Sequence, residues 1–75
     1  MRISYNKLWN LLNDNRMKKS DLARAAQLSE YMISRLNKNE PVGLDTMLKI
    51  CKVFHCNIGD VMDMIEEEKD SDELL

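Results

Sequence analysis

Apolar side chains recur at helical spacing in five segments of this chain, and polar residues separate the segments. In residues 5–15 the apolar residues recur every three or four positions, which predicts a first helix there. Ser4 is of the type that caps helix N-termini, and residues 1–4 are expected to form a short extended arm. Asn13 to Asn15 mark the end of the first helix.

Two short helices are predicted in the middle of the chain, with a break near residues 27–29. The first begins at Ser20 and Asp21 and lasts barely two turns. Ser29 can cap the second, residues 30–38, because its hydroxyl can accept hydrogen bonds from the first free amides of that helix. Two short helices that share one apolar core across such a break must cross at a large angle. This arrangement is typical of a helix-turn-helix.

A loop and two further helices are predicted after this pair. Residues 37–43 (NKNEPVG) favour a loop, because Pro41 disfavours helical geometry at the residue before it. A fourth helix is predicted over residues 44–55 and a fifth over residues 58–65, with Asn57 as the N-cap of the fifth. The apolar face of the fourth helix is expected to consist of Leu44, Met47, Leu48, Cys51 and Phe54. The whole pattern predicts a compact all-α domain of five short helices.

The composition supports one small helical domain. The chain has 75 residues, of which 44% are hydrophobic, with only one Pro and two Gly. No apolar run is longer than three residues, which excludes a membrane span and the apolar segment of a secretory signal. Two cysteines are too few for a disulfide scaffold and fit a reducing compartment, so we expect a cytoplasmic protein.

The charge is distributed unevenly along a chain whose net charge is -2. Residues 1–65 carry ten Lys or Arg against seven Asp or Glu, a net charge of +3, whereas residues 66–75 carry one Lys against six acids, a net charge of -5. Six of the basic residues lie between Arg16 and Lys38. We therefore expect a basic domain over residues 1–65 and a flexible acidic tail over residues 66–75.

The third helix carries polar residues on the side opposite Ile33 and Leu36. Arg can bond a guanine at two atoms, Glu can accept from cytosine, Ser can bond several bases, and Tyr can pack on a thymine methyl group. The predicted base-contacting residues are Glu30, Tyr31, Ser34 and Arg35. Residues near helix ends and loops are better placed for phosphates. The predicted phosphate-contacting residues are Lys18, Lys19, Ser29, Asn37, Lys38 and Asn39.

Four residues of the central helix pair follow the spacing of a known motif. They are Leu22, Ala23, Ile33 and Leu36. With the flanking segments LWNLLNDNRMKKSDLA and TMLKICKVFHCNIGDVM, they make the chain resemble the phage-repressor-like Cro/CI (Xre) helix-turn-helix regulators, above all small bacterial regulators of the YozG type. The resemblance implies a five-helix lambda-repressor-like fold, binding to double-stranded DNA and regulation of transcription, with repression as the expected effect.

Three positions carry family-specific expectations. The family usually has Gly in the turn between the paired helices, where this chain has Gln27, and Gly before the first of them, where this chain has Arg16. Residues other than Gly adopt left-handed backbone geometry at a cost of roughly 1 kcal/mol. Lys19 occupies the position where the family usually has a phosphate-binding Gln.

Simpler interpretations exist for most of these residues. The apolar residues of the helix pair can form the core of a bundle that makes only protein contacts. Each of the predicted DNA-contacting lysines, and Arg35, can be an ordinary solvated side chain. Glu30, which phosphates repel, can serve only the helix N-terminus. The order of five short helices together with the basic cluster favours DNA binding.

Metal binding and catalysis have little support. Cys51, His55 and Cys56 are close in sequence, but zinc sites normally need four ligands and no second ligand pair exists. The chain has one His, no Gly-rich phosphate loop and no nucleophile that can be placed beside a base. We expect a protein that is not an enzyme and that holds no metal or cofactor.

Two kinds of protein partner are expected. One recognition helix contacts only a few base pairs, so a homodimer on two half-sites is predicted. Val61, Met62, Met64 and Ile65 are interpreted either as core residues or as a dimer surface. The alternative function is a protein-interaction module, such as an antitoxin or anti-regulator, whose acidic tail binds a basic partner.

Overall fold

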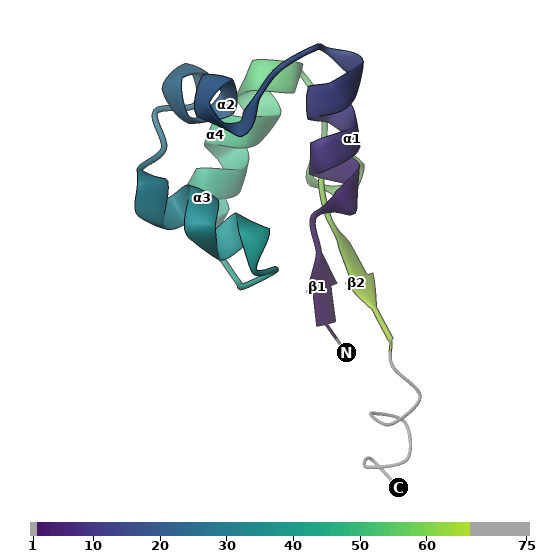
Figure 1. Ribbon diagram of the computed structural model, residues 1–75. Helices are drawn as coiled ribbons and strands as arrows, with labels where there is room; N and C mark the ends of the chain where they lie inside the picture. The colour runs from purple at the N-terminus through teal and green to yellow at the C-terminus, as the bar shows by residue number, and fades with distance from the viewer. Residues whose placement is uncertain (1, 67–75) are drawn as a thin grey trace, which may run out of the picture.

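The computed structural model describes residues 2–66, which form four α-helices, one 3-10 helix and a two-stranded sheet (Figure 1). In chain order the elements are β1 (Arg2–Ser4), α1 (Asn6–Asp14), α2 (Lys19–Ala25), α3 (Glu30–Asn37), α4 (Leu44–Phe54), the 3-10 helix η1 (Ile58–Asp60) and β2 (Asp63–Ile65). The predicted acidic tail lies outside the described residues, apart from Glu66.

The first four predicted helices are confirmed, with small shifts at their ends. Helix α2 begins at Lys19, earlier than predicted, because Asp21 acts from inside the first turn rather than from the cap position. Its Oδ2 accepts a hydrogen bond from the backbone N–H of Lys18 at 2.8 Å. Ser29 caps α3 as predicted, since its Oγ accepts from the N–H of Met32 at 3.2 Å.

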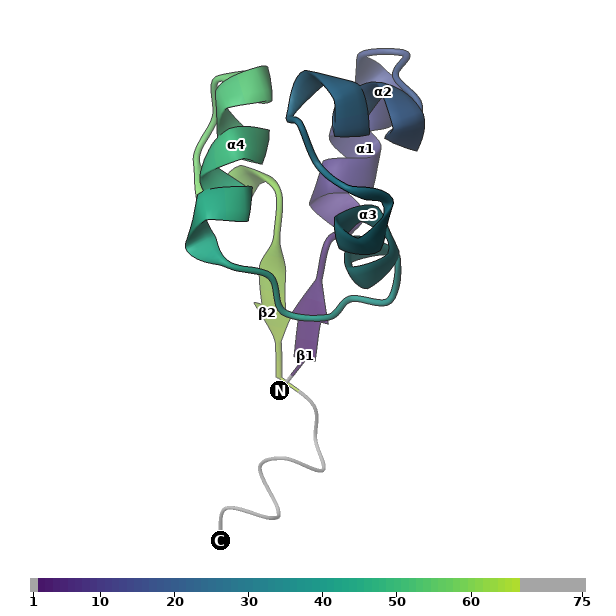
Figure 2. The ribbon, with the colours of Figure 1, turned by 90° about the vertical axis from the view of Figure 1, so that its left-hand side faces the viewer.

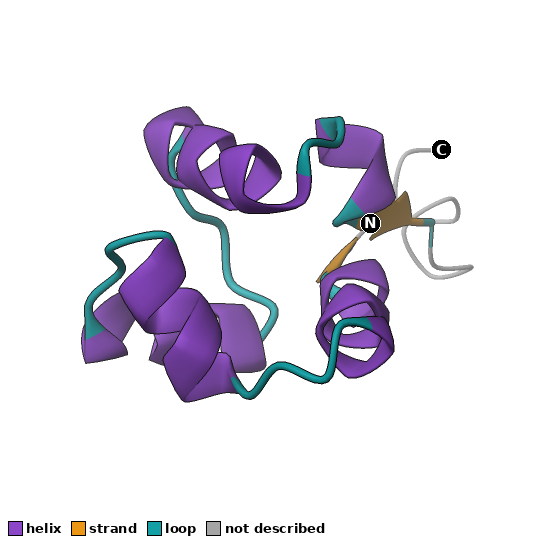
Figure 3. Ribbon diagram, turned by 90° about the horizontal axis from the view of Figure 1, so that it is seen from above, coloured by secondary structure: helices purple, strands orange, loops and turns teal. Residues whose placement is uncertain are grey.

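The predicted fifth helix is wrong. Residues 58–65 form the single turn η1 followed by strand β2, which pairs antiparallel with β1 at the other end of the described chain. The backbone groups of Asp63–Ile65 therefore bond to a partner strand instead of to their own preceding turn. Figure 3 shows this two-stranded sheet at the edge of the helical bundle. The expected five-helix lambda-repressor-like fold is thus corrected to four α-helices, one 3-10 turn and a small two-stranded antiparallel sheet.

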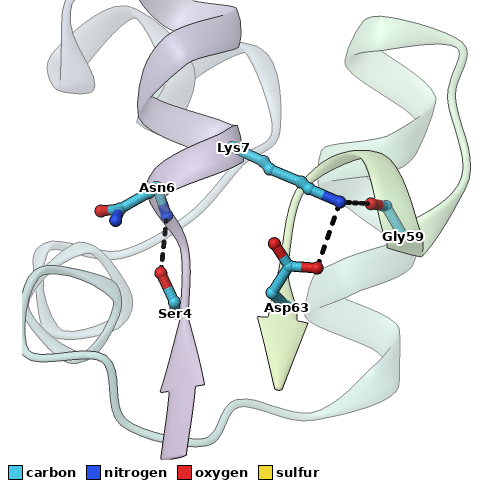
Figure 4. A network of polar contacts seen from close by, with 5 residues as sticks. All are labelled: Ser4, Asn6, Lys7, Gly59 and Asp63. Atoms are coloured by element: carbon cyan, nitrogen blue, oxygen red, sulfur yellow. Dashed lines mark hydrogen bonds and ion pairs between the residues drawn. The ribbon is translucent and has the colours of Figure 1, made fainter. Parts of the chain in front are cut away.

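Polar contacts connect the two-stranded sheet and η1 to α1 (Figure 4). The Lys7 ammonium donates a hydrogen bond to the carbonyl of Gly59 at 2.9 Å and forms an ion pair with Asp63 at 3.1 Å. Ser4, predicted as a helix cap, accepts from the N–H of Asn6 at 3.3 Å, although Tyr5 occupies the cap position. The two ends of the described chain are therefore held at the start of α1.

The hydrophobic core draws one or more residues from each helix. Its fully buried large side chains are Tyr5, Leu8, Leu22, Leu36, Ile50 and Val61. The predicted face of α4 is wrong in part, because Leu44 and Leu48 are 77% and 64% exposed. The core instead takes the neighbouring face of that helix, which contains Thr46, Met47 and Ile50. No helix in the described part of the chain has the length and apolar character to cross a membrane.

All four α-helices end in the same backbone motif. A residue with left-handed geometry follows each helix, and none of the four is Gly: they are Arg16, Gln27, Asn39 and His55, with φ between 52° and 57°. The next N–H along the chain then donates to a carbonyl five residues earlier. These bonds are Met17 to Leu12, Leu28 to Ala23, Glu40 to Arg35 and Cys56 to Cys51, with lengths of 2.8 to 3.1 Å. This is the Schellman arrangement, which stops a helix sharply and satisfies its last carbonyls.

Replacing Gln27 by Gly is expected to raise the free energy of unfolding by about 0.5–1 kcal/mol, because left-handed geometry strains a residue with a Cβ atom. Gln27 is exposed and its φ is 55°, so the substitution removes strain without opening the core. Chemical denaturation measures the difference. Asn39→Gly is the control, since the side chain of Asn39 accepts a hydrogen bond from Tyr5 and its loss offsets the relief. A Gln27→Gly variant less stable than the wild type would contradict the assignment of strain.

Candidate nucleic-acid interface

The turn between α2 and α3 sets α3 apart from the helix before it. Leu28 in this turn packs against the core and fixes the crossing of the two helices. The Ser29 backbone is extended, with ψ at 162°, so α3 starts as a new helix and does not continue α2. Figure 2 shows α3 at the outer side of the molecule. The capped break at Ser29 lets α3 leave α2 in a new direction, which a helix-turn-helix requires.

Helix α3 is buried along one edge only. Leu36 is completely buried and Ile33 packs against the core, whereas Tyr31 is 64% exposed. Glu30 is also exposed, and Ser34 is half-buried. The outward face predicted from the sequence is therefore largely present, with Glu30, Tyr31 and Ser34 accessible from solvent.

A groove of about 460 Å³ runs between α2 and α3. It brings together four of the predicted DNA-contacting residues, namely Lys19, Glu30, Ser34 and Asn37. Ser20 and Arg24 of α2, which were not predicted as DNA-contacting residues, also line it. Their spacing of four residues, which places both on one side of α2, was the available signal.

The charge of Arg24 is partly engaged inside α2. Its Nη2 lies 2.6 Å from Oδ1 of Asp21 in an exposed ion pair. The pKa of the Asp21 carboxyl is lowered, first by the backbone N–H of Lys18 that bonds to it and then by Arg24. Asp21 thus serves the start of α2 and at the same time holds Arg24 beside the groove.

The side chain of Arg35 bends back onto the loop between α3 and α4. Its Nε and Nη2 donate to the carbonyl oxygen of Pro41 at 3.1 and 2.6 Å, and its Nη1 donates to the hydroxyl of Tyr31 at 3.2 Å. A base contact by Arg35, as predicted, requires the guanidinium to leave Pro41. The contact to a base remains a prediction, and the loop contact is a role that no local sequence pattern indicated.

The predicted phosphate-contacting residues fall into two groups. Lys18 and Lys38 are exposed near helix ends, and Ser29 is exposed with its hydroxyl at the start of α3. The other three bond to residues in other parts of the fold: the Lys19 ammonium donates to Oδ1 of Asn37, and Oδ1 of Asn39 accepts from the N–H of Tyr5 at 3.2 Å. Both Asn side chains keep an NH₂ group, which is the donor that a phosphate needs.

Tyr5 anchors the loop that follows α3. Its side chain is 1% exposed, and its hydroxyl donates to the carbonyl of Glu40 at 2.7 Å. Burial raises the pKa of the Tyr5 hydroxyl, and the positive charge of Arg35 offsets part of that rise. The neutral hydroxyl is therefore the form that the folded protein stabilises.

The cysteines and histidine form no metal site in the described part of the chain. Cys51 and Cys56 are free thiols, and no group of three or more His, Cys, Asp or Glu side chains in residues 2–66 could hold a metal ion. Burial raises the pKa of the Cys56 thiol, and the neighbouring Cys51 thiol adds to the rise. Both residues line a shallow groove beside α4, away from the α2–α3 groove.

Comparison with known proteins agrees with this geometry. The sequence model of the Cro/C1-type HTH DNA-binding domain matches residues 7–67, so the chain belongs to this family of helix-turn-helix domains. A crystal structure of the transcriptional regulator VanUg superimposes on the chain with a TM-score of 0.83 at 44% sequence identity, covering 88% of each chain. A comparison with curated protein sequences gave no match. The predicted Cro/CI membership is confirmed.

Replacing Tyr5 by Phe is expected to lower the free energy of unfolding near neutral pH by about 0.5–1.5 kcal/mol, because the carbonyl of Glu40 loses its donor. The raised pKa predicts the pH dependence. The unfolded chain releases this proton near the ordinary tyrosine pKa of 10.0, whereas the folded chain keeps it to higher pH, so the Tyr5 hydroxyl stabilises the fold below that value.

This contribution is lost as the pH rises through the folded pKa, so the stability gap between wild type and Tyr5→Phe should narrow above about pH 10. Denaturant titrations at several alkaline pH values measure that gap. Tyr31→Phe is the matched control, since Tyr31 is exposed. A gap that stays constant through this range would show that Tyr5 does not titrate differently in the two states.

Proposed function

We propose that this protein is a sequence-specific regulator of transcription that inserts α3 into the major groove of double-stranded DNA. The observation that supports it is the capped break at Ser29. It separates α3 from α2 and leaves the face with Glu30, Tyr31 and Ser34 accessible while Leu36 is buried. A helix presented in this way beside a second helix is the geometry that helix-turn-helix proteins use on DNA.

The proposed contacts follow from exposure and chemistry. Tyr31 and Ser34 contact base edges, and Glu30 accepts from the amino group of a cytosine. Arg35 adds a guanine contact when its guanidinium exchanges the Pro41 carbonyl for the base. Lys18, Lys19, Ser29 and Lys38 bind phosphates along the flanks, with the NH₂ group of Asn39 as a further donor, while Asn37 acts through its hydrogen bond with Lys19. In this proposal the bound protein acts as a repressor by occupying its site.

DNA sites selected from a random pool should share one short motif, and binding to that motif should weaken steeply with salt. If a dimer contacts about five to nine phosphates, the log-log slope of affinity against salt is about -4 to -8. Arg35→Ala should reduce discrimination by about 1–3 kcal/mol at one base pair in each half-site. Gel-shift titrations on the selected site and on single-base variants measure both.

Lys38→Met is the contrasting variant. It removes a proposed phosphate contact, so it should weaken binding to all sequences alike and reduce the salt slope by about 1 per recognition helix. Because Arg35 also bonds to the loop, thermal unfolding of Arg35→Ala must accompany the titrations. A wild-type protein that selects no motif would refute the proposed function, and an unchanged discrimination in Arg35→Ala would leave that residue with the loop role only.

We also propose that two copies bind DNA together through an apolar surface on the side of α4, η1 and β2. Four of the five exposed large hydrophobic residues in the described chain belong to it: Leu44, Leu48, Ile58 and Met64. Ile58 lines two neighbouring grooves, one beside α4 with a volume of about 270 Å³ and one beside β2. The expectation for residues 61–65 changes accordingly, since Val61 is completely buried in the core and is not available to a partner.

Leu48→Glu is expected to prevent pairing, because it places a charge in the middle of an apolar contact. Leu48 is 64% exposed in the single chain, so the variant should keep its fold. Sedimentation of the protein, alone and on DNA with one or two half-sites, measures the effect. Asn10→Glu on the exposed part of α1 is the charge control. If Leu48→Glu still binds the two-half-site DNA cooperatively, the second copy contacts a different surface.

A further inference from the structure

Lys19, the first residue of α2, joins three helices through its ammonium. The Nζ atom lies 4.3 Å from the centroid of the Trp9 ring in α1. The same atom donates a hydrogen bond to Oδ1 of Asn37, the last residue of α3. Lys19 lines both the cleft between α1 and α2 and the groove between α2 and α3. The Lys19 ammonium therefore lies where α3 meets α1 and α2.

The two contacts order a side chain that is otherwise flexible. A lysine has four rotatable bonds, and a free lysine must give up much of that freedom when its ammonium binds a phosphate. The Trp9 face attracts the cation and the Asn37 carbonyl fixes its direction. An ammonium has three N–H donors, so donors remain for a phosphate beside the groove. The Lys19 side chain is therefore already ordered in the free protein, and it loses less conformational entropy when it binds a phosphate.

We propose that Trp9 and Asn37 are positioning residues for DNA binding, which hold the Lys19 ammonium in place for one phosphate. The proposal rests on the function proposed above and assigns a purpose to two residues outside the base-contacting face. In it, the Oδ1 atom of Asn37 acts through Lys19, so the contribution of Asn37 disappears when Lys19 has no charge. Neither Trp9 nor this use of Asn37 followed from the sequence pattern.

A set of substitutions in the full chain tests the proposal on the selected DNA site. Asn37→Ala and Trp9→Leu leave the ammonium present but unordered, so each should weaken binding about 2- to 10-fold with the salt slope unchanged. Lys19→Met removes the phosphate contact itself and should reduce the salt slope by about 1 per recognition helix. Adding Asn37→Ala to Lys19→Met should cause no further loss, because the two residues act as a unit.

Matched variants separate this role from folding and from simple charge. Lys18→Met removes an equal charge from the adjacent exposed position, and Asn37→Ala should still weaken binding in that background. Trp9→Phe keeps an aromatic face and should bind better than Trp9→Leu. Thermal unfolding is measured for each variant. Asn37 is exposed, so Asn37→Ala provides the test even if Trp9→Leu does not fold.

A spectroscopic measurement reports the geometry without DNA. The ring current of Trp9 should shift the NMR signals of the Lys19 methylene next to the ammonium upfield, and the shift should vanish in Trp9→Leu and diminish in Asn37→Ala. The proposal is overturned if Asn37→Ala binds DNA as the wild type does, or if it weakens Lys19→Met further. A wild type that binds no DNA while it shows the upfield shift would refute the proposed function instead, since the contact would then be purely structural.

Discussion

The end of α3, the proposed recognition helix, is held by a residue outside it, Tyr5, and the rest of the proposed interface depends on that contact. The hydroxyl and the backbone N–H of Tyr5 bond to Glu40 and Asn39, so the loop after α3 is tied to the residue that begins α1. Arg35 bonds to the same loop at Pro41 from within α3. Because β1 precedes Tyr5 directly and pairs with β2, the loop after α3, the first helix and the two-stranded sheet form one connected unit. The angle at which α3 is presented is therefore a property of the whole domain.

Sharp helix ends make this arrangement possible in a short chain. The Schellman motif at each of the four α-helices turns the chain within a few residues, and three of the residues that follow the left-handed positions, Met17, Leu28 and Cys56, pack against the core. Each of these sites uses a residue with a Cβ atom, at a cost of roughly 1 kcal/mol per site. At the three sites where the following side chain is apolar, its partial burial offsets that cost by an amount of the same order, about 1 kcal/mol. Glycine is therefore dispensable at these turns.

The sequence was a good guide wherever the deciding contacts were local. Helical spacing and the Ser29 cap predicted α1 to α4, and the motif of Leu22, Ala23, Ile33 and Leu36 predicted the family. The failure at residues 58–65 has a physical cause, since their apolar spacing also suits a helix while the strand partner lies some sixty residues away at Arg2–Ser4. A three-residue strand has no periodicity to detect. Arg35, Lys19 and Asn39 were predicted as DNA-contacting residues, whereas their contacts with Pro41, Trp9 and Tyr5 depend on the tertiary structure, which no local pattern contains.

The charges around the α2–α3 groove indicate how such a domain would distinguish sequences. Lys19 and Arg24 face Glu30 across it, and Arg24 is bound to Asp21, so the groove itself is close to neutral. Attraction to phosphates is the sequence-independent part of DNA binding and grows with the number of cations engaged, so in the proposed complex this groove contributes to it mainly through the Lys19 ammonium. In the proposed complex, Glu30 lowers affinity for DNA in general, but less for a site that offers it a cytosine amino group. A carboxylate at the start of the recognition helix therefore raises the ratio of specific to non-specific binding while it reduces both. The proposed regulator therefore depends on base contacts, and on the α3 helices of two copies acting together, for its useful affinity.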